Sequence, residues 1–257
     1  MITSTGNAKI RNVVQLRKKA KERQIQDVFL IEGIHMFREV PKEQLQEVYA
    51  SETFLRRPEN RKLLEGISYE PVTDTVAAYM SDTQTPQGII CLVRQFHYTL
   101  QDLQGRNSLC MVLENLQDPG NLGTIIRTAE GAGATGILMN RGCVDIYNPK
   151  VIRSTMGSIL RVPFFYTDDL KETLVRWKRS GVALCAAHLR GTMNYTAPDY
   201  TGKTAFLIGN ESNGLSEETA LLADRLVKIP MKGKVESLNA SVAASILLYE
   251  AARQRDM

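Results

Sequence analysis

The sequence holds few of the residues that build metal sites and covalent cross-links. Of its 257 residues, only four are cysteine and three are histidine. Cys91, Cys110, Cys143 and Cys185 are widely spaced and form no C-x-x-C pair, and three of them lie in or beside apolar runs. The sequence therefore predicts packed, reduced thiols and no metal site.

Long apolar segments are also missing. No run of about 18 apolar residues is present, so a transmembrane helix is not expected. The first 20 residues have no apolar stretch of the kind found in secretory signals. Hydrophobic residues make up 43% of the chain and charged residues 23%, which excludes a disordered or fibrous protein. These features predict a cytoplasmic protein with one large domain or two modest ones.

Basic and acidic residues nearly balance over the whole chain, but not along it. The 32 basic and 28 acidic residues give a net charge of +4, yet residues 1–26 alone carry +6 and the remaining 231 residues carry −2. Ile10, Val13, Val14 and Leu16 form an apolar stripe at helical spacing within this basic arm. The arm is either a solvated helix face or a phosphate-binding segment, and its scarcity of acid favours the second interpretation.

Two larger segments follow the arm, which we place at residues 1–24. Residues 25–95 are expected to form a small α/β unit that includes the turn sequence T-P-Q-G at 85–88. Residues 96–107 are polar and are expected to be a linker, and residues 108–257 form the second domain. In the first unit, the expected strands and helices cover residues 28–31, 34–40, 48–50, 75–81 and 89–93.

In the second domain, predicted strands alternate with predicted helices. This alternation is typical of an α/β fold with a mostly parallel sheet and helices on both faces. The expected strands cover residues 109–113, 136–139, 164–166, 183–187, 205–208 and 227–229. The expected helices cover residues 122–132, 149–158, 170–179, 216–223 and 238–253.

Two glycine patterns resemble nucleotide-binding loops but stand in the wrong context. Residues 131–136 match G-x-G-x-x-G, yet they close a predicted helix and lead into a strand, the reverse of a dinucleotide site. Residues 202–204 resemble the end of a P-loop, but the upstream glycine is absent and a strand follows. A nicotinamide-dependent dehydrogenase is therefore not favoured.

Three other segments combine the end of a strand, a polar turn and the start of a helix. They are residues 115–129, 206–216 and 229–246. The first contains Asn121, the expected cap of a helix, and Arg127 six residues later. The second frames Glu211 with two glycines, and the third leads into an Ala/Ser-rich helix capped by Ser237 or Asn239. Ligands of parallel sheets bind beyond the carboxyl ends of strands, where these turns are expected.

In this order and spacing, the three segments resemble the motifs of the SpoU (TrmH) family of RNA ribose methyltransferases, part of the SPOUT superfamily. The patterns are N-x-G-x-x-x-R, G-x-E-x-x-G and I-P-M-x-G-x-x-x-S-L-N-x-S-x-A. The matching positions are Asn121, Gly123, Arg127, Gly209, Glu211, Gly214, Ile229, Pro230, Met231, Gly233, Ser237, Leu238, Asn239, Ser241 and Ala243. Residues 25–95 are more loosely similar to the L30e-like substrate-binding domain often attached to this family.

This resemblance implies a fold and a cofactor. The family fold is a parallel sheet whose C-terminal part is threaded into a deep trefoil knot, a rare exception to the usual topology rules. The loops of the knot bind S-adenosylmethionine in a bent shape, largely through backbone groups. The cofactor-binding residues implied here are Leu207, Ile208, Gly209, Ile229, Met231, Ser237 and Leu238.

The implied reaction is metal-free methyl transfer to a ribose 2′-hydroxyl. The resemblance implies that Arg127 acts on this hydroxyl, either as a base or as a cation that stabilises the developing alkoxide. The second role is physically easier, because arginine keeps its proton. Glu211 is the rival base. Asn121, Ser237 and Asn239 are expected to orient these groups or the substrate.

The implied partners are RNA, with ribosomal RNA favoured over tRNA, and a second copy of the chain in a homodimer. Phosphate contacts are expected to supply the affinity for RNA. The candidate RNA-binding residues are Lys9, Arg11, Arg17, Lys18, Lys19, Arg153 and Lys232, with Arg141, Lys150, Arg161 and Lys234 as further candidates. The alternatives are a tRNA 2′-O-methyltransferase and a catalytically silent RNA-binding protein of the same fold.

Overall fold

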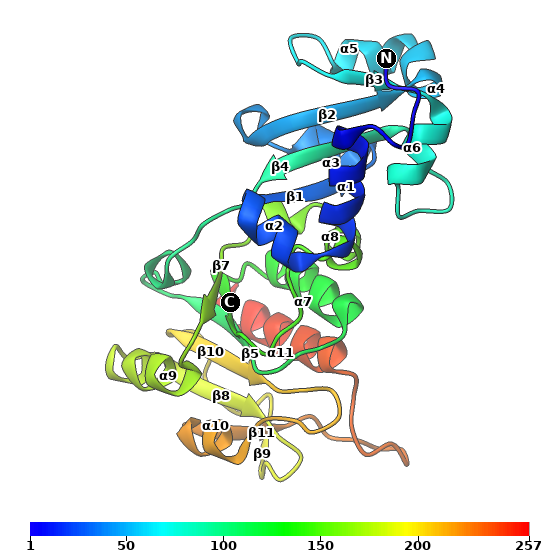
Figure 1. The fold of residues 1–257 in the computed structure, drawn as a ribbon. Coiled ribbons are helices and arrows are strands. Elements are labelled where there is room, and N and C mark those ends of the chain that lie inside the picture. Colours follow the sequence, from blue (N-terminus) through cyan, green and yellow to red (C-terminus); the bar gives the residue numbers. More distant parts are fainter. Residues whose placement is uncertain (257) are drawn as a thin grey trace. The chain divides into compact units, whose positions relative to one another are not determined.

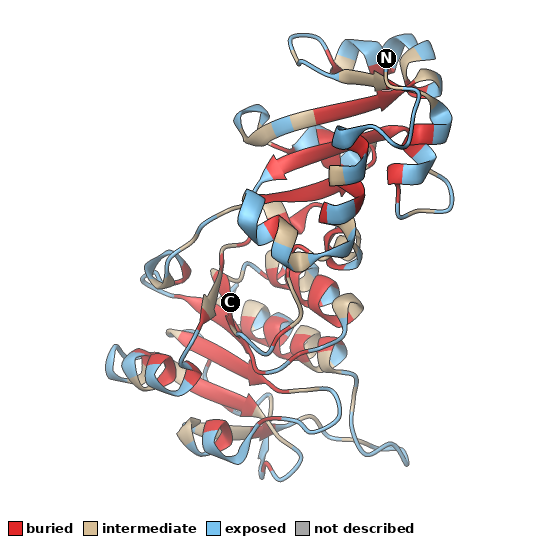
Figure 2. Ribbon diagram, viewed as in Figure 1, coloured by how far each residue is buried: buried red, intermediate tan, exposed pale blue. Residues whose placement is uncertain are grey.

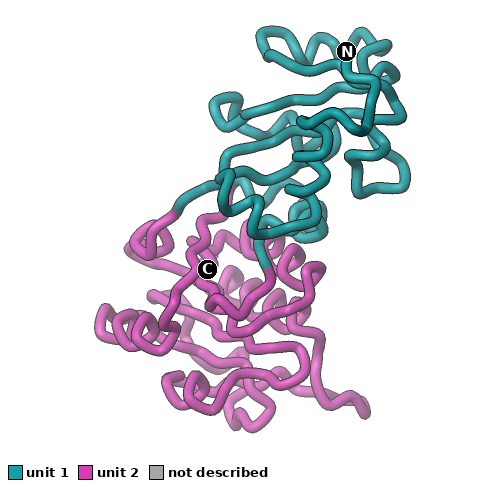
Figure 3. The backbone as a smooth tube through the Cα atoms, viewed as in Figure 1, with its two compact units in different colours: residues 1–97, 145–160 teal, residues 98–144, 161–257 magenta. Residues whose placement is uncertain are grey.

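A computed structural model describes residues 1–256. The chain forms two compact units, shown in different colours in Figure 3. Unit 1 contains residues 1–97 together with residues 145–160, and unit 2 contains residues 98–144 and the chain from residue 161 onward. Residues 145–160, which the sequence groups with the second domain, therefore pack with unit 1. The predicted domain boundaries stay a prediction, because compactness describes packing rather than independent folding.

Unit 1 is built on a four-stranded sheet with the strand order β1-β4-β2-β3 (Figure 1). Strand β4 runs antiparallel to both of its neighbours, β1 and β2, and β3 runs parallel to β2. The strands are β1 (Val28–Glu32), β2 (Leu45–Ser51), β3 (Glu70–Val72) and β4 (Ile89–Arg94). The helices are α1 (Ala8–Lys18), α2 (Ala20–Gln26), α3 (Ile34–Glu39), α4 (Glu52–Arg56), α5 (Pro58–Leu63), α6 (Asp74–Met80) and α8 (Pro149–Thr155), with short 3-10 turns at Lys42–Gln44 and Ser158–Leu160.

Helix α1, which lies within the basic arm at residues 1–24, packs into the core of unit 1. Its apolar stripe, Ile10, Val13 and Leu16, is fully buried against side chains of the sheet and of α6. Burial of such side chains is the main stabilising term in folding. Helix α1 is therefore an integral part of the unit, with Lys9, Arg11 and Lys18 exposed and Arg17 partly buried.

The 145–160 segment is fastened to unit 1 by polar and aromatic contacts. Arg23, which is 3% exposed, forms an ion pair with Asp145 and donates a hydrogen bond to the backbone oxygen of Leu16. The ring of Tyr147 stacks on Phe29 of β1 with the ring centroids 4.6 Å apart. A buried guanidinium needs a paired carboxylate, so the Arg23–Asp145 ion pair fixes the position at which residues 145–160 pack against the rest of unit 1.

Unit 2 contains a seven-stranded sheet in the order β7-β6-β5-β10-β8-β11-β9, with every neighbouring pair parallel. The predicted parallel α/β fold is confirmed. The strands are β5 (Leu109–Leu113), β6 (Gly136–Asn140), β7 (Phe164–Thr167), β8 (Ala183–Ala187), β9 (Met193–Asn194), β10 (Thr204–Ile208) and β11 (Arg225–Lys228). The helices are α7 (Pro119–Gly131), α9 (Leu170–Arg179), α10 (Glu217–Leu222) and α11 (Ala240–Arg255), with a 3-10 turn at Leu100–Leu103.

The central strands of this sheet are buried on both faces (Figure 2). On one face, Trp177 of α9 and Ala220 of α10 pack with alternate side chains of β5, β8 and β10. Helices α7 and α11 pack against each other and α11 also contacts β10 (Figure 1). Burial on both faces explains why these strands read as continuous apolar runs. No helix among residues 1–256 is long and apolar enough to cross a membrane.

Candidate active site

Three loops at the carboxyl edge of the unit 2 sheet carry the sequence motifs. The first follows β5 and leads into α7, the second follows β10, and the third follows β11 and leads into α11. Strand β10 lies between β5 and β8, and β11 is the next strand along. Because all these strands are parallel, their carboxyl ends meet at one edge, where ligands of α/β sheets bind.

Helix α7 begins one turn earlier than the sequence suggests. Its cap is Asp118, whose Oδ1 accepts a hydrogen bond of 2.7 Å from the backbone N–H of Asn121, and Pro119 occupies the first helical position. The prediction that Asn121 caps the helix is wrong. Asn121 lies within the first turn and is 8% exposed, so its side-chain amide is available for contacts across the sheet edge.

Glu211 holds the first loop from across the sheet. Its Oε1 accepts hydrogen bonds from the backbone N–H of Asp118 at 2.9 Å and from Nδ2 of Asn121 at 3.1 Å. Its Oε2 accepts one from the backbone N–H of Gln117 at 3.1 Å. Partial burial alone would raise the pKa of Glu211, but these hydrogen bonds outweigh it and lower the pKa. Glu211 is therefore a fixed carboxylate whose oxygens are already engaged.

Asn239 extends this network to the third loop. Its Nδ2 donates a hydrogen bond of 2.9 Å to Oδ1 of Asn121. Its own Oδ1 caps α11 by accepting from the backbone N–H groups of Ser241 at 2.9 Å and Val242 at 3.3 Å. The sequence predicts either Ser237 or Asn239 as the cap of this helix, and the structure has Asn239 in that position. One chain of hydrogen bonds, Glu211 to Asn121 to Asn239, thus joins all three motifs.

Arg127 is not part of this chain. It lies on α7 about 9 Å along the helix axis from Asn121, and its side chain is exposed. Its guanidinium makes no hydrogen bond or ion pair with any of residues 1–256. The structure therefore does not bring Arg127 together with Glu211 or Asn239, and it leaves a cation free on the helix that the network orients.

A cavity of about 610 Å³ opens beside the network, within unit 2. Of the seven predicted cofactor-binding residues, six line it: Ile208, Gly209, Ile229, Met231, Ser237 and Leu238. Leu207 does not, because its side chain is fully buried in the core on the α9 face of the sheet. Glu211 also lines the cavity, so the fixed carboxylate lies at its edge.

Sequence reasoning missed one wall of this cavity. The segment after β8, from Ala187 through His188 and Leu189 to Arg190, contributes lining residues. Burial lowers the pKa of His188, and the nearby Arg190 lowers it further. The carboxyl end of β8 opens at this edge because β8 lies directly between β10 and β11, an order that is set by the fold and not by a local sequence pattern.

The glycines around Glu211 are required by a tight turn. A Cβ on Gly209 would collide with the backbone of Gly214, and Gly214 has a φ of +69°. Asn210 and Gly214 exchange backbone hydrogen bonds of 3.0 and 2.9 Å across the turn. Only glycine permits this close approach of two backbones. The turn therefore fixes the position of Glu211.

The third loop presents bare backbone to the cavity. No backbone N–H of residues 231–238 donates a hydrogen bond to any of residues 1–256, and no carbonyl of that segment accepts one. Backbone polar groups are normally paired when they are buried. Here Met231, Ser237 and Leu238 line the cavity, so their backbone groups are available to a ligand.

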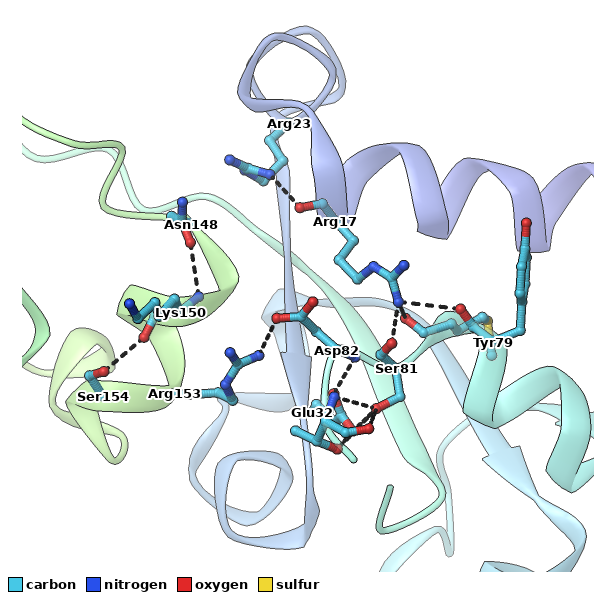
Figure 4. Close-up of polar contacts among 12 residues, drawn as sticks. Arg17, Arg23, Glu32, Tyr79, Ser81, Asp82, Asn148, Lys150, Arg153 and Ser154 are labelled. Atoms are coloured by element: carbon cyan, nitrogen blue, oxygen red, sulfur yellow. Dashed lines mark hydrogen bonds and ion pairs between the residues drawn. The ribbon is translucent and has the colours of Figure 1, made fainter. Parts of the chain in front are cut away.

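The predicted RNA-binding cations fall into two groups. Figure 4 shows two members of the first group, Arg17 and Arg153, with their partners. Arg17 donates hydrogen bonds to the backbone oxygens of Tyr79, Met80 and Ser81 at the end of α6. Lys9 pairs with Glu70, and Arg153 pairs with Asp82. These three side chains already have partners within unit 1. By contrast, the exposed side chains of four others make no ion pair or hydrogen bond within residues 1–256: Arg11, Lys18, Lys19 and Lys232.

The side chains that commonly bind metals are not clustered in this arrangement. Across the described part of the chain, no group of three or more His, Cys, Asp or Glu residues is placed to hold a metal ion. All four cysteines are free and buried.

A parallel sheet, a cavity at its carboxyl edge and three loops joined by hydrogen bonds define a class of ligand-binding α/β protein. Family comparison identifies this class. Residues 108–249 match the model of the SpoU rRNA Methylase family, and residues 7–91 match an MRM3-like substrate binding domain. The chain belongs to the SpoU family.

Individual relatives span nearly the whole chain. An uncharacterized tRNA/rRNA methyltransferase of Synechocystis is 33% identical over 99% of this chain and 94% of its own length. The 23S rRNA (guanosine(2553)-2′-O)-methyltransferase RlmP of Bacillus subtilis is 31% identical over 96% of this chain and 97% of its own. The structure of the SpoU methyltransferase AviRb from Streptomyces viridochromogenes, in complex with the cofactor AdoMet, has a TM-score of 0.88 at 27% identity and covers 97% of this chain and 98% of AviRb.

The cofactor of this family, S-adenosylmethionine, fits the cavity by its chemistry. A volume of about 610 Å³ lies within the range of about 300–1,000 Å³ typical of small-ligand sites. Apolar walls formed by Ile208, Val227 and Leu238 suit an adenine ring. The unpaired backbone groups of residues 231–238 supply donors and acceptors for its polar edges.

Proposed function

We propose that the protein transfers a methyl group from S-adenosylmethionine to the 2′-hydroxyl of a ribose in RNA. The observation that carries this proposal is the hydrogen-bond chain from Glu211 through Asn121 to Asn239, which joins the three family motifs at the rim of the cavity. The relative RlmP is a 2′-O-methyltransferase of 23S rRNA, which supports the same substrate class here.

Bound S-adenosylmethionine supplies an activated methyl on a sulfonium, so the chain must align the hydroxyl and manage its charge. In the transfer, the 2′-oxygen forms a bond to the methyl carbon while the sulfur–carbon bond breaks, and the hydroxyl proton leaves to solvent. Arg127 stabilises the negative charge that develops on the oxygen, directly or through the adjacent phosphate. It does so as a cation, because a solvent-exposed guanidinium does not give up its proton.

Glu211 serves as a positioning residue rather than as the base. Its two oxygens accept three hydrogen bonds, and its lowered pKa makes it a weak proton acceptor. It holds the start of α7, and α7 carries Arg127. Asn121 and Asn239 transmit the same constraint to the start of α11. Precise placement of this kind is a large part of catalysis in reactions without covalent intermediates.

Ribosomal RNA is the favoured substrate, with tRNA as the alternative. Calorimetry with S-adenosylmethionine, followed by transfer of its labelled methyl group to purified rRNA and tRNA, tests the proposal. We expect cofactor binding and labelling of rRNA. Absence of cofactor binding would favour a catalytically silent RNA-binding protein, and labelling of tRNA alone would reverse the order of substrates.

We propose in addition that the active form is a homodimer whose interface includes α11. Val242 and Tyr249 are 46% and 55% exposed and lie seven residues apart, two turns along the same face of this helix. Exposed apolar side chains aligned in this way are typical of an interface. Sedimentation of the wild type and of the Val242→Glu, Tyr249→Glu variant tests this, since the charged pair should give monomers. The trefoil knot and a cytoplasmic location are further parts of the proposal that follow from the family.

A further inference from the structure

Unit 1 contains a cavity to which no role has yet been assigned. Its volume is about 440 Å³, again within the range of sites for small ligands. Ile34, Phe54 and Pro86 give it apolar walls. The turn sequence T-P-Q-G at residues 85–88, which the methyl-transfer chemistry does not use, forms part of its rim.

This rim is held rigidly. Oε1 of Gln87 accepts a hydrogen bond of 2.8 Å from the backbone N–H of Ile34, and the backbone N–H of Ser51 donates one of 2.8 Å to the carbonyl of Gly88. Gly88 has a φ of +81°, and a Cβ there would collide with Oγ of Ser51. Glycine is therefore needed at position 88. The turn places Gln87 at the cavity and leaves it little freedom to move.

A mostly buried side chain with a free acceptor atom lines this space. Asn60 lines the cavity and is only 6% exposed. Its Nδ2 donates a hydrogen bond of 3.1 Å to the carbonyl of Phe54, which fixes the orientation of the amide. Its Oδ1 accepts no hydrogen bond from any of residues 1–256. Because the amide is held in place and this oxygen is free, it can accept a hydrogen bond from a ligand that carries a donor.

A donor and a cation complete the lining. The Nε2 group of Gln87 donates to no atom of residues 1–256, because only its Oε1 is engaged. Arg57 lines the cavity with an exposed side chain, and Arg61 follows one turn later on α5. Neither guanidinium forms an ion pair within the described part of the chain. The cavity thus offers one acceptor, one donor, apolar walls and a free positive charge at its mouth.

We propose that this cavity receives one unstacked base of the RNA substrate, and the proposal rests on the function given above. Every nucleobase has an edge with hydrogen-bonding groups and an apolar face, and proteins read RNA mainly through such splayed-out bases. The Asn60 oxygen accepts from an N–H of the base, while Nε2 of Gln87 donates to a base oxygen or ring nitrogen. Arg57 contacts a neighbouring phosphate, which adds affinity without sequence information.

The test compares two substitutions in the full-length protein, one in the T-P-Q-G turn and one just before it. Gln87→Glu keeps the acceptor for the Ile34 N–H but removes the donor and adds a negative charge. Gln84→Glu adds the same charge three residues away, at an exposed side chain outside the cavity. Affinity for in vitro transcribed 23S rRNA is measured for both, together with the thermal midpoint. We expect about a tenfold weaker binding for Gln87→Glu alone, the equivalent of one hydrogen bond to a base that covers the site.

A second readout locates the base itself. Transcripts containing 4-thiouridine are photo-crosslinked to the wild-type protein, and we expect crosslinks at residues 53–60 and 85–88. Equal affinities of the two variants, or crosslinks that avoid both segments, would overturn the proposal. The affinity measurement needs no methyl transfer, so a protein that binds RNA through Gln87 without methylating it would refute the proposed function and leave this inference standing.

Discussion

Two groups of polar residues stand out in this chain, and their side chains have different partners. At the sheet edge of unit 2, Glu211, Asn121 and Asn239 bind one another across three separate loops. On the surface of unit 1, Lys9 and Arg17 of the basic helix α1 bind nearby carboxylate and carbonyl oxygens of their own unit. The first group builds a site, whereas part of the second only holds helices in place.

The difference shows what a charge count leaves out. A net charge of +6 over residues 1–26 is real, but only cations without a partner in the protein remain available to an RNA phosphate. By that criterion Lys18 and Lys19 qualify and Arg17 does not. In unit 2, Arg127 also meets this criterion: its side chain is free within residues 1–256, whereas Glu211, Asn121 and Asn239 are all engaged.

The largest effect is expected at Arg127. Arg127→Ala should lower the rate of methyl transfer by about 100- to 1,000-fold, the usual cost of removing one group that stabilises charge in a transition state. Affinity for S-adenosylmethionine should stay within about twofold, because Arg127 does not line the cavity. Single-turnover transfer and calorimetry measure the two quantities.

Arg176→Ala is the matched control, since Arg176 is also an exposed arginine on a helix of unit 2. It should leave both quantities unchanged. A rate for Arg127→Ala close to that of the control would show that Arg127 has no part in the mechanism. The lack of a partner would then not identify a catalytic cation.

Glu211→Gln should have the next largest effect. The NH2 group that replaces one oxygen cannot accept a hydrogen bond, so the N–H of either Gln117 or Asp118 loses its acceptor. The start of α7 then loosens, and transfer slows by about tenfold or more. Glu218→Gln on α10 removes the same charge at an exposed position and should leave transfer at the wild-type rate.

The same variant has a pH signature. The pKa of Glu211 is lower in the folded protein than in the unfolded chain, so the carboxylate stabilises the fold above the unfolded pKa of about 4.3. That stability is lost as the pH falls below this value toward the folded pKa. The thermal midpoint of the wild type should therefore drop more steeply below about pH 4.5 than that of Glu211→Gln. Parallel curves would show that Glu211 is not held as the hydrogen bonds indicate.

Asn239 separates two roles in one side chain. Asn239→Ala should cost about 1 kcal/mol of stability, the usual contribution of a helix N-cap, and should also slow transfer. Asn239→Asp restores the cap oxygen for Ser241 and Val242 but loses the donor to Asn121. It should recover the thermal midpoint and not the rate. Full recovery of both would mean that the link to Asn121 has no part in positioning.

Much of this architecture can be predicted from sequence, because strands buried on both faces read as apolar runs. The pattern predicts residues 109–113, 170–179 and 183–187 with their observed bounds. It misses the two-residue strand β9 and the short helices α4 and α5, since pairing and packing decide such short elements rather than local pattern.

In the site, the motif residues are identifiable from sequence but their contacts are not. Asn121 suits a helix cap by its residue type, whereas Asp118 holds that position. The wall after β8 and the buried amide of Asn60 depend on strand order and on long-range packing. Neither is encoded in the spacing of nearby residues. Likewise, the buried stripe of α1 is visible in the sequence, but the partners of Lys9 and Arg17 are not.

The smallest effect is expected for the cations at the end of α1, where Lys18 and Lys19 have no partner among residues 1–256 and Arg17 does. Deletion of residues 1–24 would remove the buried Ile10, Val13 and Leu16 and disrupt unit 1, so point variants are needed. The double variant Lys18→Ala, Lys19→Ala should keep its thermal midpoint and bind RNA more weakly. The slope of log K against log salt should fall by about one for each phosphate that is no longer bound.

Arg17→Ala should do the opposite, because Arg17 satisfies carbonyl oxygens at the end of α6. It should lower the thermal midpoint and leave the salt slope of RNA binding unchanged. Filter binding at several salt concentrations, with thermal unfolding of the same samples, measures both. If Arg17→Ala reduces the slope as much as the double variant, a partner within the protein does not keep a cation from RNA. The criterion that Arg127 also meets would then fail.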